Sequence, residues 1–160
     1  MASSSTNKIV LISGDGISFE VTEAVAREFQ PVAHIIEDDC AITTTTISNV
    51  TGEILSKMIE YSKKHVEEAP IDEEDKEGKK KLQIWDEEFM KQFNMEILFQ
   101  LILAADYSTN KGLLDLTCCT VADHIKDMTP DEVRTLFNIE NDYTTEEEEE
   151  IRKENAWAFE

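Results

Sequence analysis

The chain opens with an apolar pattern that is typical of β-structure. The run KIVLIS at 8–13 is short, apolar and rich in β-branched residues, and ISFEV at 17–21 alternates apolar with polar side chains. Gly14-Asp15-Gly16 lies between the two runs, and glycine accepts the positive φ that tight turns require. The pattern therefore predicts a β-hairpin.

Helical spacing follows the hairpin. A short helix is predicted over EAVAREF at 23–29, broken by Pro31, and a further turn over VAHII at 32–36. The β-branched, polar segment AITTTTISNV at 41–50 predicts a loop that contains a short strand. From Thr51 onward the period is clearly helical, with apolar residues on one stripe at Ile54, Leu55, Met58, Ile59 and Val66.

Residues 67–81, EEAPIDEEDKEGKKK, hold almost no apolar side chains. Such a segment cannot bury enough surface to offset the entropy of ordering it. We therefore expect a disordered acidic linker between an N-terminal and a C-terminal half.

The C-terminal half has helical spacing throughout. Trp85, Phe89 and Phe93 begin it, and MEILFQLILAADY at 95–107 is apolar on nearly all sides, which predicts a buried central helix. NKGLLDLTCCTVADHIK at 110–126 predicts another helix, with leucine, valine and isoleucine at helical spacing.

Two capping boxes predict where the last two helices begin. Thr129 with Glu132, and Thr144 with Glu147, have the same spacing, and Pro130 suits the first helical position. The second box opens a run of glutamates, which suits the positive end of a helix dipole. That helix has almost no apolar face.

The chain ends in WAFE, so two aromatic residues follow this charged helix. An isolated helix of such length is only marginally stable in water. Trp157 and Phe159 are expected to pack either on the chain's own core or on a partner protein, and the sequence leaves both alternatives open.

The charge narrows the choice of partners. Of the 160 residues 41% are apolar, enough for one domain or two small halves, but the formal net charge is −20. Nucleic acid and anionic membranes are therefore not expected as partners, because their phosphates would be repelled. The longest apolar stretch, 97–105, is far shorter than the roughly 20 residues that span a bilayer. The start MASSSTNK lacks the apolar core of a secretion signal, and the odd number of cysteines (Cys40, Cys118 and Cys119) indicates a reducing compartment.

No pattern of catalytic or metal-binding residues stands out. His34, His65 and His124 are scattered and lack ligand spacing. Cys118 or Cys119 with His124 would lie on different faces of a helix, with no third orienting group. The glycines of the hairpin do not precede a helix, so they form no phosphate cradle. We expect no catalysis, no metal and no cofactor.

A series of motifs in one order extends over almost the whole chain. The most specific is TPDEVRTLFNI followed by EEEEEIRKENAW; the others are KIVLISGDGISFEV, VAHIIEDD, ILSKMIEY, the pattern W-D-x-x-F, LFQLILAADY and KGLLDLTCCTVADHIK. These motifs resemble the Skp-type adaptor subunit of SCF ubiquitin ligases, and the ending WAFE resembles plant members of that family.

The resemblance implies an α/β fold class, namely a BTB/POZ domain that opens with the hairpin and is followed by a C-terminal helical extension. The expected domains are 7–66 for the first part of the BTB/POZ domain, 67–81 for the linker, 82–126 for its helical completion and 127–160 for the C-terminal F-box-binding helices. The implied function is to bridge a cullin to F-box proteins, without catalysis, in the cytoplasm and nucleus.

The resemblance also implies two contact surfaces. The expected cullin-binding residues are Val32, Ile35, Ile47, Asp106 and Tyr107. The expected F-box-binding residues are apolar or weakly polar: Phe99, Leu114, Cys118, Val121, Ile125, Phe137, Ile139 and Trp157. An F-box helix could lie in a groove between them. Alternatively about half of them hold the chain's own helices together, and Leu114, Val121 and Ile125 fit either role.

The chain departs from the family pattern after the central helix, where the usual AANYL-x-I-K reads AADYSTNK. Asp106 brings a charge in place of a neutral amide, and Ser108 and Asn110 replace apolar residues, which predicts a loss of burial. These changes leave a second hypothesis open, a divergent paralogue that binds F-box proteins yet engages cullin weakly. A third hypothesis, from another class, is a cysteine-based enzyme.

Overall fold

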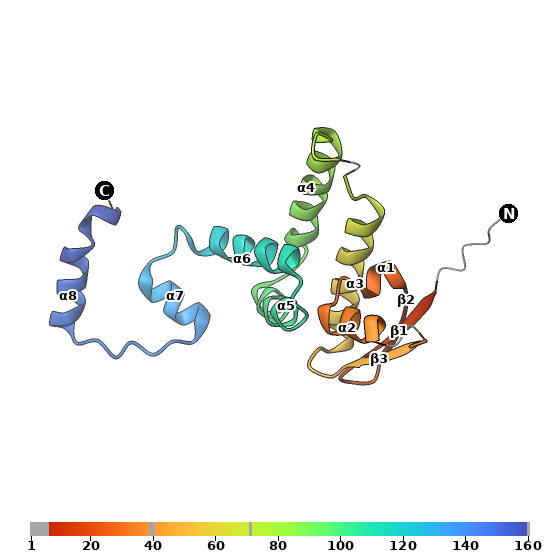
Figure 1. Cartoon of the computed structure of the whole chain (residues 1–160). Coiled ribbons are helices and arrows are strands. Elements are labelled where there is room, and N and C mark those ends of the chain that lie inside the picture. The colour runs from red at the N-terminus through yellow and green to blue at the C-terminus, as the bar shows by residue number, and fades with distance from the viewer. Residues whose placement is uncertain (1–6, 39–40, 71, 160) are drawn as a thin grey trace. The chain divides into compact units, whose positions relative to one another are not determined.

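The structure is a computed structural model that describes residues 7–38, 41–70 and 72–159. The chain forms two compact units that divide between Asp123 and His124. The first unit is called the core unit and the second the C-terminal unit. Figure 1 shows the elements of both.

A three-stranded sheet begins the core unit. Strands β1 (Lys8–Ser13) and β2 (Ser18–Thr22) pair antiparallel, and Gly16 has a φ of 85° in the turn between them. The predicted hairpin is confirmed. Strand β3 (Thr44–Ile47) lies on the other side of β1 and runs parallel to it, so the order is β2-β1-β3 (Figure 1). This strand is the short one expected within 41–50.

Six helices complete the core unit or begin in it: α1 (Glu23–Ala26), α2 (Gln30–Asp38), α3 (Gly52–Glu67), α4 (Lys76–Lys91), α5 (Met95–Tyr107) and α6 (Lys111–Ile125). Pro31 lies in the first turn of α2, where its missing N–H leaves no hydrogen bond unmade. In the described part of the chain, no helix is both long and apolar enough to cross a membrane.

The core lies where α1 and α3 pack against the sheet and α5 packs against α3. Its largest fully buried apolar side chains come from every layer: Leu11, Phe29, Val32, Leu55, Met58, Leu98, Leu101 and Leu113. Helix α5 was expected to be buried on nearly all sides. One side of it is buried through Leu98, Leu101 and Ala105, but Leu103 on the other side is 71% exposed.

The acidic linker is shorter than expected, because α4 begins inside the range 67–81. The Asp75 carboxylate caps the helix by accepting a hydrogen bond from the Gly78 N–H at 2.9 Å, and Lys81 pairs with Glu77 at 3.0 Å. Only 68–75 separate α3 from α4, and residue 71 lies outside the described part. The start of α4 was not predicted, because the segment is poor in apolar residues and the helix start depends on one capping side chain.

An aromatic cluster accompanies this arrangement of α3 and α4. The His65 ring of α3 stacks on Tyr61 with centroids 4.0 Å apart, and its Nε2 lies 2.7 Å from Oδ1 of Asp86 on α4. On α4, the rings of Trp85 and Phe89 stack at 4.7 Å. His65 therefore has a structural role, as its lack of ligand spacing suggested.

The C-terminal unit contains α7 (Pro130–Phe137), α8 (Thr145–Glu154) and a 3₁₀ turn (Ala156–Phe159). Both predicted capping boxes are present, and the Glu132 and Glu147 carboxylates each accept a hydrogen bond from the backbone N–H of the threonine that caps their helix. Arg134 of α7 lies 2.7 Å from Asp131 and 3.5 Å from Glu148 of α8. Neither helix has a buried residue, so this unit depends on caps and ion pairs.

Candidate partner-binding surfaces

A groove of about 150 Å³ lies between α2, β3 and the end of α5. We call it the α2–β3 groove, and its lining includes Val32, Ile35, Ile47 and Tyr107, four of the five predicted cullin-binding residues. Val32 and Ile47 are buried, and Ile35 and Tyr107 are partly exposed. Val32 and Ile47 therefore shape the groove from within, and only Ile35 and Tyr107 offer substantial surface to a partner.

A second groove, of about 300 Å³, adjoins Tyr107 on its other side. This α3–α5 groove is lined by Asn49, Val50, Thr51, Ile54, Gln100, Leu103, Ala104 and Tyr107. Sequence reasoning missed it, although the all-round apolar character of 95–107 was a signal, because a helix that is apolar on every side and exposed on one leaves that side for a partner. Tyr107 lines both grooves and joins them into one surface.

Ser108 and Asn110, which depart from the family pattern, are buried and hydrogen-bonded rather than simply lost from the core. The Ser108 hydroxyl donates to the Ala104 carbonyl at 2.8 Å, and the Ser108 carbonyl accepts from the Gln30 N–H at 3.0 Å. Asn110 Oδ1 accepts from the Leu113 N–H at 3.1 Å, which caps the start of α6. The side-chain contacts of Ser108 and Asn110 therefore partly offset the expected loss of burial, although Nδ2 of Asn110 is buried without a hydrogen-bond partner.

Asp106 differs from its neighbours because it is exposed and lines neither groove. It precedes Tyr107 in the last turn of α5, three residues after Leu103, so the three side chains share the solvent side of the helix. Its main-chain carbonyl accepts a hydrogen bond from the Thr109 N–H at 3.0 Å. Thr109 takes a positive φ of 54°, which turns the chain toward α6.

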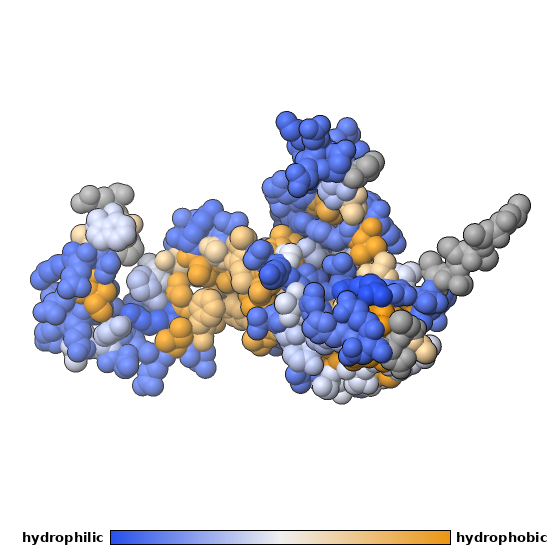
Figure 2. All heavy atoms as spheres, viewed as in Figure 1, coloured by the Kyte–Doolittle hydropathy of each residue, from blue (hydrophilic) through white to orange (hydrophobic). Residues whose placement is uncertain are grey.

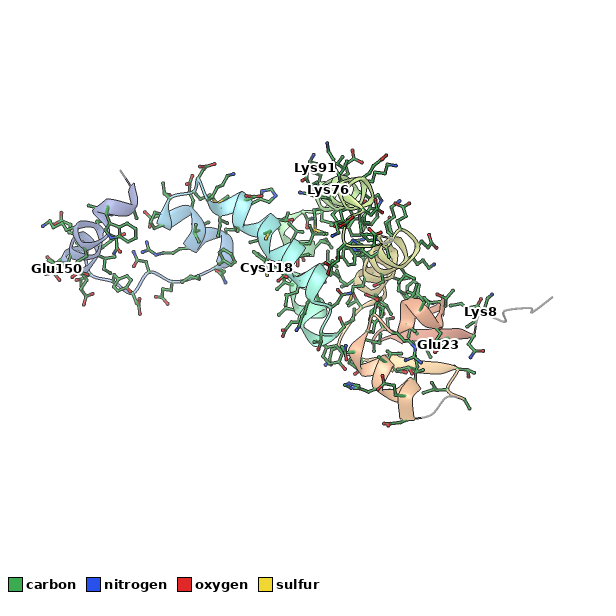
Figure 3. All side chains as sticks on the ribbon, turned by 45° about the horizontal axis from the view of Figure 1, so that its top comes forward. Lys8, Glu23, Lys76, Lys91, Cys118 and Glu150 are labelled. Atoms are coloured by element: carbon green, nitrogen blue, oxygen red, sulfur yellow. The ribbon has the colours of Figure 1, made fainter. Side chains whose placement is uncertain are left out.

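Four predicted F-box-binding residues lie in the core unit, on α5 and α6. Phe99 and Leu114 are half-buried and pack against the core, and Cys118 is exposed on α6 (Figure 3). Val121 is 7% exposed and belongs to the core. In Figure 2 apolar residues gather at the surface over α6. The alternative that part of this set holds the helices together therefore applies to Val121 above all.

The other four lie in the C-terminal unit. Ile125 is half-buried, and Phe137 and Ile139 are exposed. Trp157 is 75% exposed. The Trp157 indole is therefore not buried within the C-terminal unit, and both alternatives for the terminal aromatics stay predictions; the Phe159 side chain lies outside the described residues.

The chemistry-bearing residues form no metal cluster in the described ranges: no group of three or more His, Cys, Asp or Glu is placed to hold an ion. Cys118 and Cys119 are free and exposed. Cys40 lies outside the described residues.

Comparison with known proteins gives two matches to family models, the Skp1 family tetramerisation domain over residues 7–67 and the Skp1 family dimerisation domain over 111–158. The chain is also similar over nearly its whole length to several proteins of Arabidopsis thaliana. It is 61% identical to SKP1-like protein 14, with 98% of this chain and 99% of the relative covered. It is 57% identical to SKP1-like protein 1A, with the same coverage.

The chain belongs to the Skp1 family. The resemblance to plant-like Skp-type adaptors of SCF ubiquitin ligases, drawn from the sequence motifs, is thereby confirmed. So is the fold class, since the match over 7–67 covers β1 to α3 and the helices to the C-terminus follow it. The grooves at Tyr107 and the exposed side chains near the C-terminus are thus surfaces of a Skp1-family adaptor.

Proposed function

We propose that this Skp1-family chain bridges a cullin scaffold to F-box substrate receptors through protein–protein contacts alone, and that it does so in the cytoplasm and nucleus. The observation that carries the proposal is that a chain with a net charge of −20 has uncharged grooves at Tyr107 and exposed apolar side chains in its C-terminal unit. An adaptor needs two such surfaces, and the charge keeps them soluble.

The cullin is assigned to the surface around Tyr107. The grooves on either side of this residue are lined by uncharged side chains, and Leu103 and Tyr107 offer exposed apolar area between them. Apolar grooves of this kind accept the apolar face of a partner helix.

F-box proteins are assigned to the exposed apolar residues of α6, α7 and the C-terminal turn. In the C-terminal unit α7 and α8 bury no residue, and Phe137, Ile139 and Trp157 are exposed. Aromatic side chains such as Trp157 are common anchors at protein interfaces. An F-box segment with an apolar face would cover these exposed side chains.

The test is a reconstitution of the three proteins. Mixed with an F-box protein, the chain should form a stable one-to-one complex in size-exclusion chromatography with light scattering, and a cullin N-terminal domain should then join it. Tyr107→Ala should lose the cullin and keep the F-box protein. Trp157→Ala should lose the F-box protein and keep the cullin. Failure to retain any F-box protein would overturn the proposal.

Asp106 supports one alternative, the divergent paralogue that binds F-box proteins but engages cullin weakly, in the case of a cullin segment that presents no positive charge to it. The side chain puts an exposed negative charge beside Tyr107. Titration of the cullin domain against the purified F-box complex separates the alternatives, because affinity equal to that of a relative with asparagine at this position would remove the reason for a weak-binding paralogue.

A further inference from the structure

The end of α5 carries an electrostatic conflict. A helix has partial negative charge at its C-terminus, where cations stabilise it and carboxylates do not. Helix α5 has no basic residue in its last turn and has Asp106 there instead. Helices α3 and α8 follow the usual rule, with Lys64 and His65 in the last turn of one and Arg152 and Lys153 in that of the other.

Among the described residues, none provides a compensating cation. In the described part of the chain no lysine, arginine or histidine pairs with the Asp106 carboxylate, and no charged residue lines either groove beside it. Asp106 is thus an exposed charge next to two grooves with uncharged linings, beside Leu103 and Tyr107. Such a charge adds nothing to folding, but at the rim of an interface it selects a partner of opposite charge.

We infer that Asp106 is a specificity-determining residue of the cullin-binding surface. It selects a cullin segment that places a lysine or arginine next to the apolar side chains entering the grooves at Tyr107. This inference rests on the proposed function. The carboxylate attracts the partner cation during the encounter, and the net charge of −20 acts in the same direction over longer range.

The experiment measures the association of a plant cullin N-terminal domain with the complex of the full chain and an F-box protein, by stopped-flow or surface plasmon resonance. Asp106→Asn removes the charge and keeps the shape. At about 50 mM salt the variant should associate roughly threefold to tenfold more slowly than the unmodified chain, and at about 500 mM salt the difference should vanish because screening removes rim electrostatics.

Glu96→Gln is the matched control, since it makes the same change of net charge at the other end of α5, where Glu96 is exposed in the first turn. Its association rate should change far less. Equal slowing in both variants would show that net charge alone acts, and unchanged or faster association of Asp106→Asn would also overturn the inference.

Melting temperature provides a second measurement. Asp106→Asn should melt at the same or a slightly higher temperature, because it relieves the unfavourable placement at the helix end. A lower melting temperature together with slow association would indicate a structural role and contradict the inference. If neither the variant nor the unmodified chain binds cullin, the proposed function fails; if both bind equally well, only the role of Asp106 fails.

Discussion

The two units of this chain become ordered in different ways. The core unit buries leucines and aromatic residues between a sheet and several helices, and its fully buried side chains include Leu11, Phe29 and Leu101. The C-terminal unit buries no residue in α7 or α8, and its helices are held by two capping boxes and by the Arg134 ion pairs. Burial stabilises a fold cooperatively, whereas caps and exposed ion pairs each contribute only about 1 kcal/mol or less.

Under the proposed function, this difference gives the two partner surfaces different character. The grooves at Tyr107 are preformed, because their walls are fixed by buried residues such as Val32 and Ile47. The C-terminal unit presents exposed side chains on short helices that are marginally stable by themselves. We expect it to gain order when an F-box protein binds, and this expectation is open to direct tests.

The largest effect is expected from a core substitution. Leu101→Ala should lower the free energy of unfolding by about 2–5 kcal/mol, because Leu101 is fully buried in α5 and its truncation leaves a cavity. The matched control is Leu136→Ala in α7, where the leucine is only half-buried. Urea unfolding followed by circular dichroism measures both. Equal losses in the two variants would contradict the contrast between the units.

The next largest effect concerns binding rather than folding. Trp157→Ala should leave the melting temperature unchanged, because the indole is 75% exposed. It should weaken F-box binding by about 2 kcal/mol or more, as the loss of an aromatic anchor does. Calorimetric titration with an F-box protein measures the change, and Ile84→Ala, an exposed apolar position on α4, is the control. An unchanged dissociation constant would remove Trp157 from the interface.

The elements that sequence predicted best are those with local signals. The hairpin around Gly16, helix α5 and both capping boxes depend on residues within a few positions of one another. The parallel pairing of β3 with β1 was not predicted, since it joins segments more than 30 residues apart, such as Val10 and Thr44. The start of α4 was missed because the composition of 67–81 outweighed the single cap at Asp75.

The candidate surfaces show the same difference between features with a local sequence signal and features that depend on distant segments. The family resemblance predicted Tyr107 as well as Val32, Ile35 and Ile47, which line the α2–β3 groove together with it. The α3–α5 groove was missed because Asn49–Ile54 and Gln100–Tyr107 meet only in the folded chain. The sequence could not predict whether Val121 is buried or exposed, because apolar residues that face the core and apolar residues that face a partner recur with the same helical period.

A smaller effect should come from the caps. Thr144→Ala removes the hydroxyl that accepts from the Glu147 N–H and should cost α8 about 1 kcal/mol. Hydrogen exchange should then be faster at the first amides of α8 only. Thr51→Ala at the start of α3 is the comparison, since this helix packs in the core and its loss should appear in global unfolding. A global shift from Thr144→Ala would mean that the units unfold together.

The smallest expected effect is a pH dependence of stability that differs between the two units. In the core unit, two hydrogen bonds lower the pKa of Asp15 below its ordinary value, the larger effect coming from the Ser13 hydroxyl and the smaller from the Gly52 N–H. The hydrogen bond from Gly52 joins the hairpin turn to the start of α3, 37 residues away along the chain. In the C-terminal unit, the Thr129 N–H lowers the pKa of Glu132 within its own capping box. A lowered pKa means that the folded state binds the proton less readily than the unfolded state, so the stabilisation is complete above the unfolded pKa, near 4. It is lost as the pH falls through the folded pKa.

Compared with the unmodified chain, Asp15→Asn should therefore be less stable at pH 7 in global unfolding, with a difference that narrows below about pH 4. Glu132→Gln should show the same pH dependence only in hydrogen exchange of α7, because its contact reaches no other element. A pH-dependent global shift from Glu132→Gln would contradict the independence of the two units.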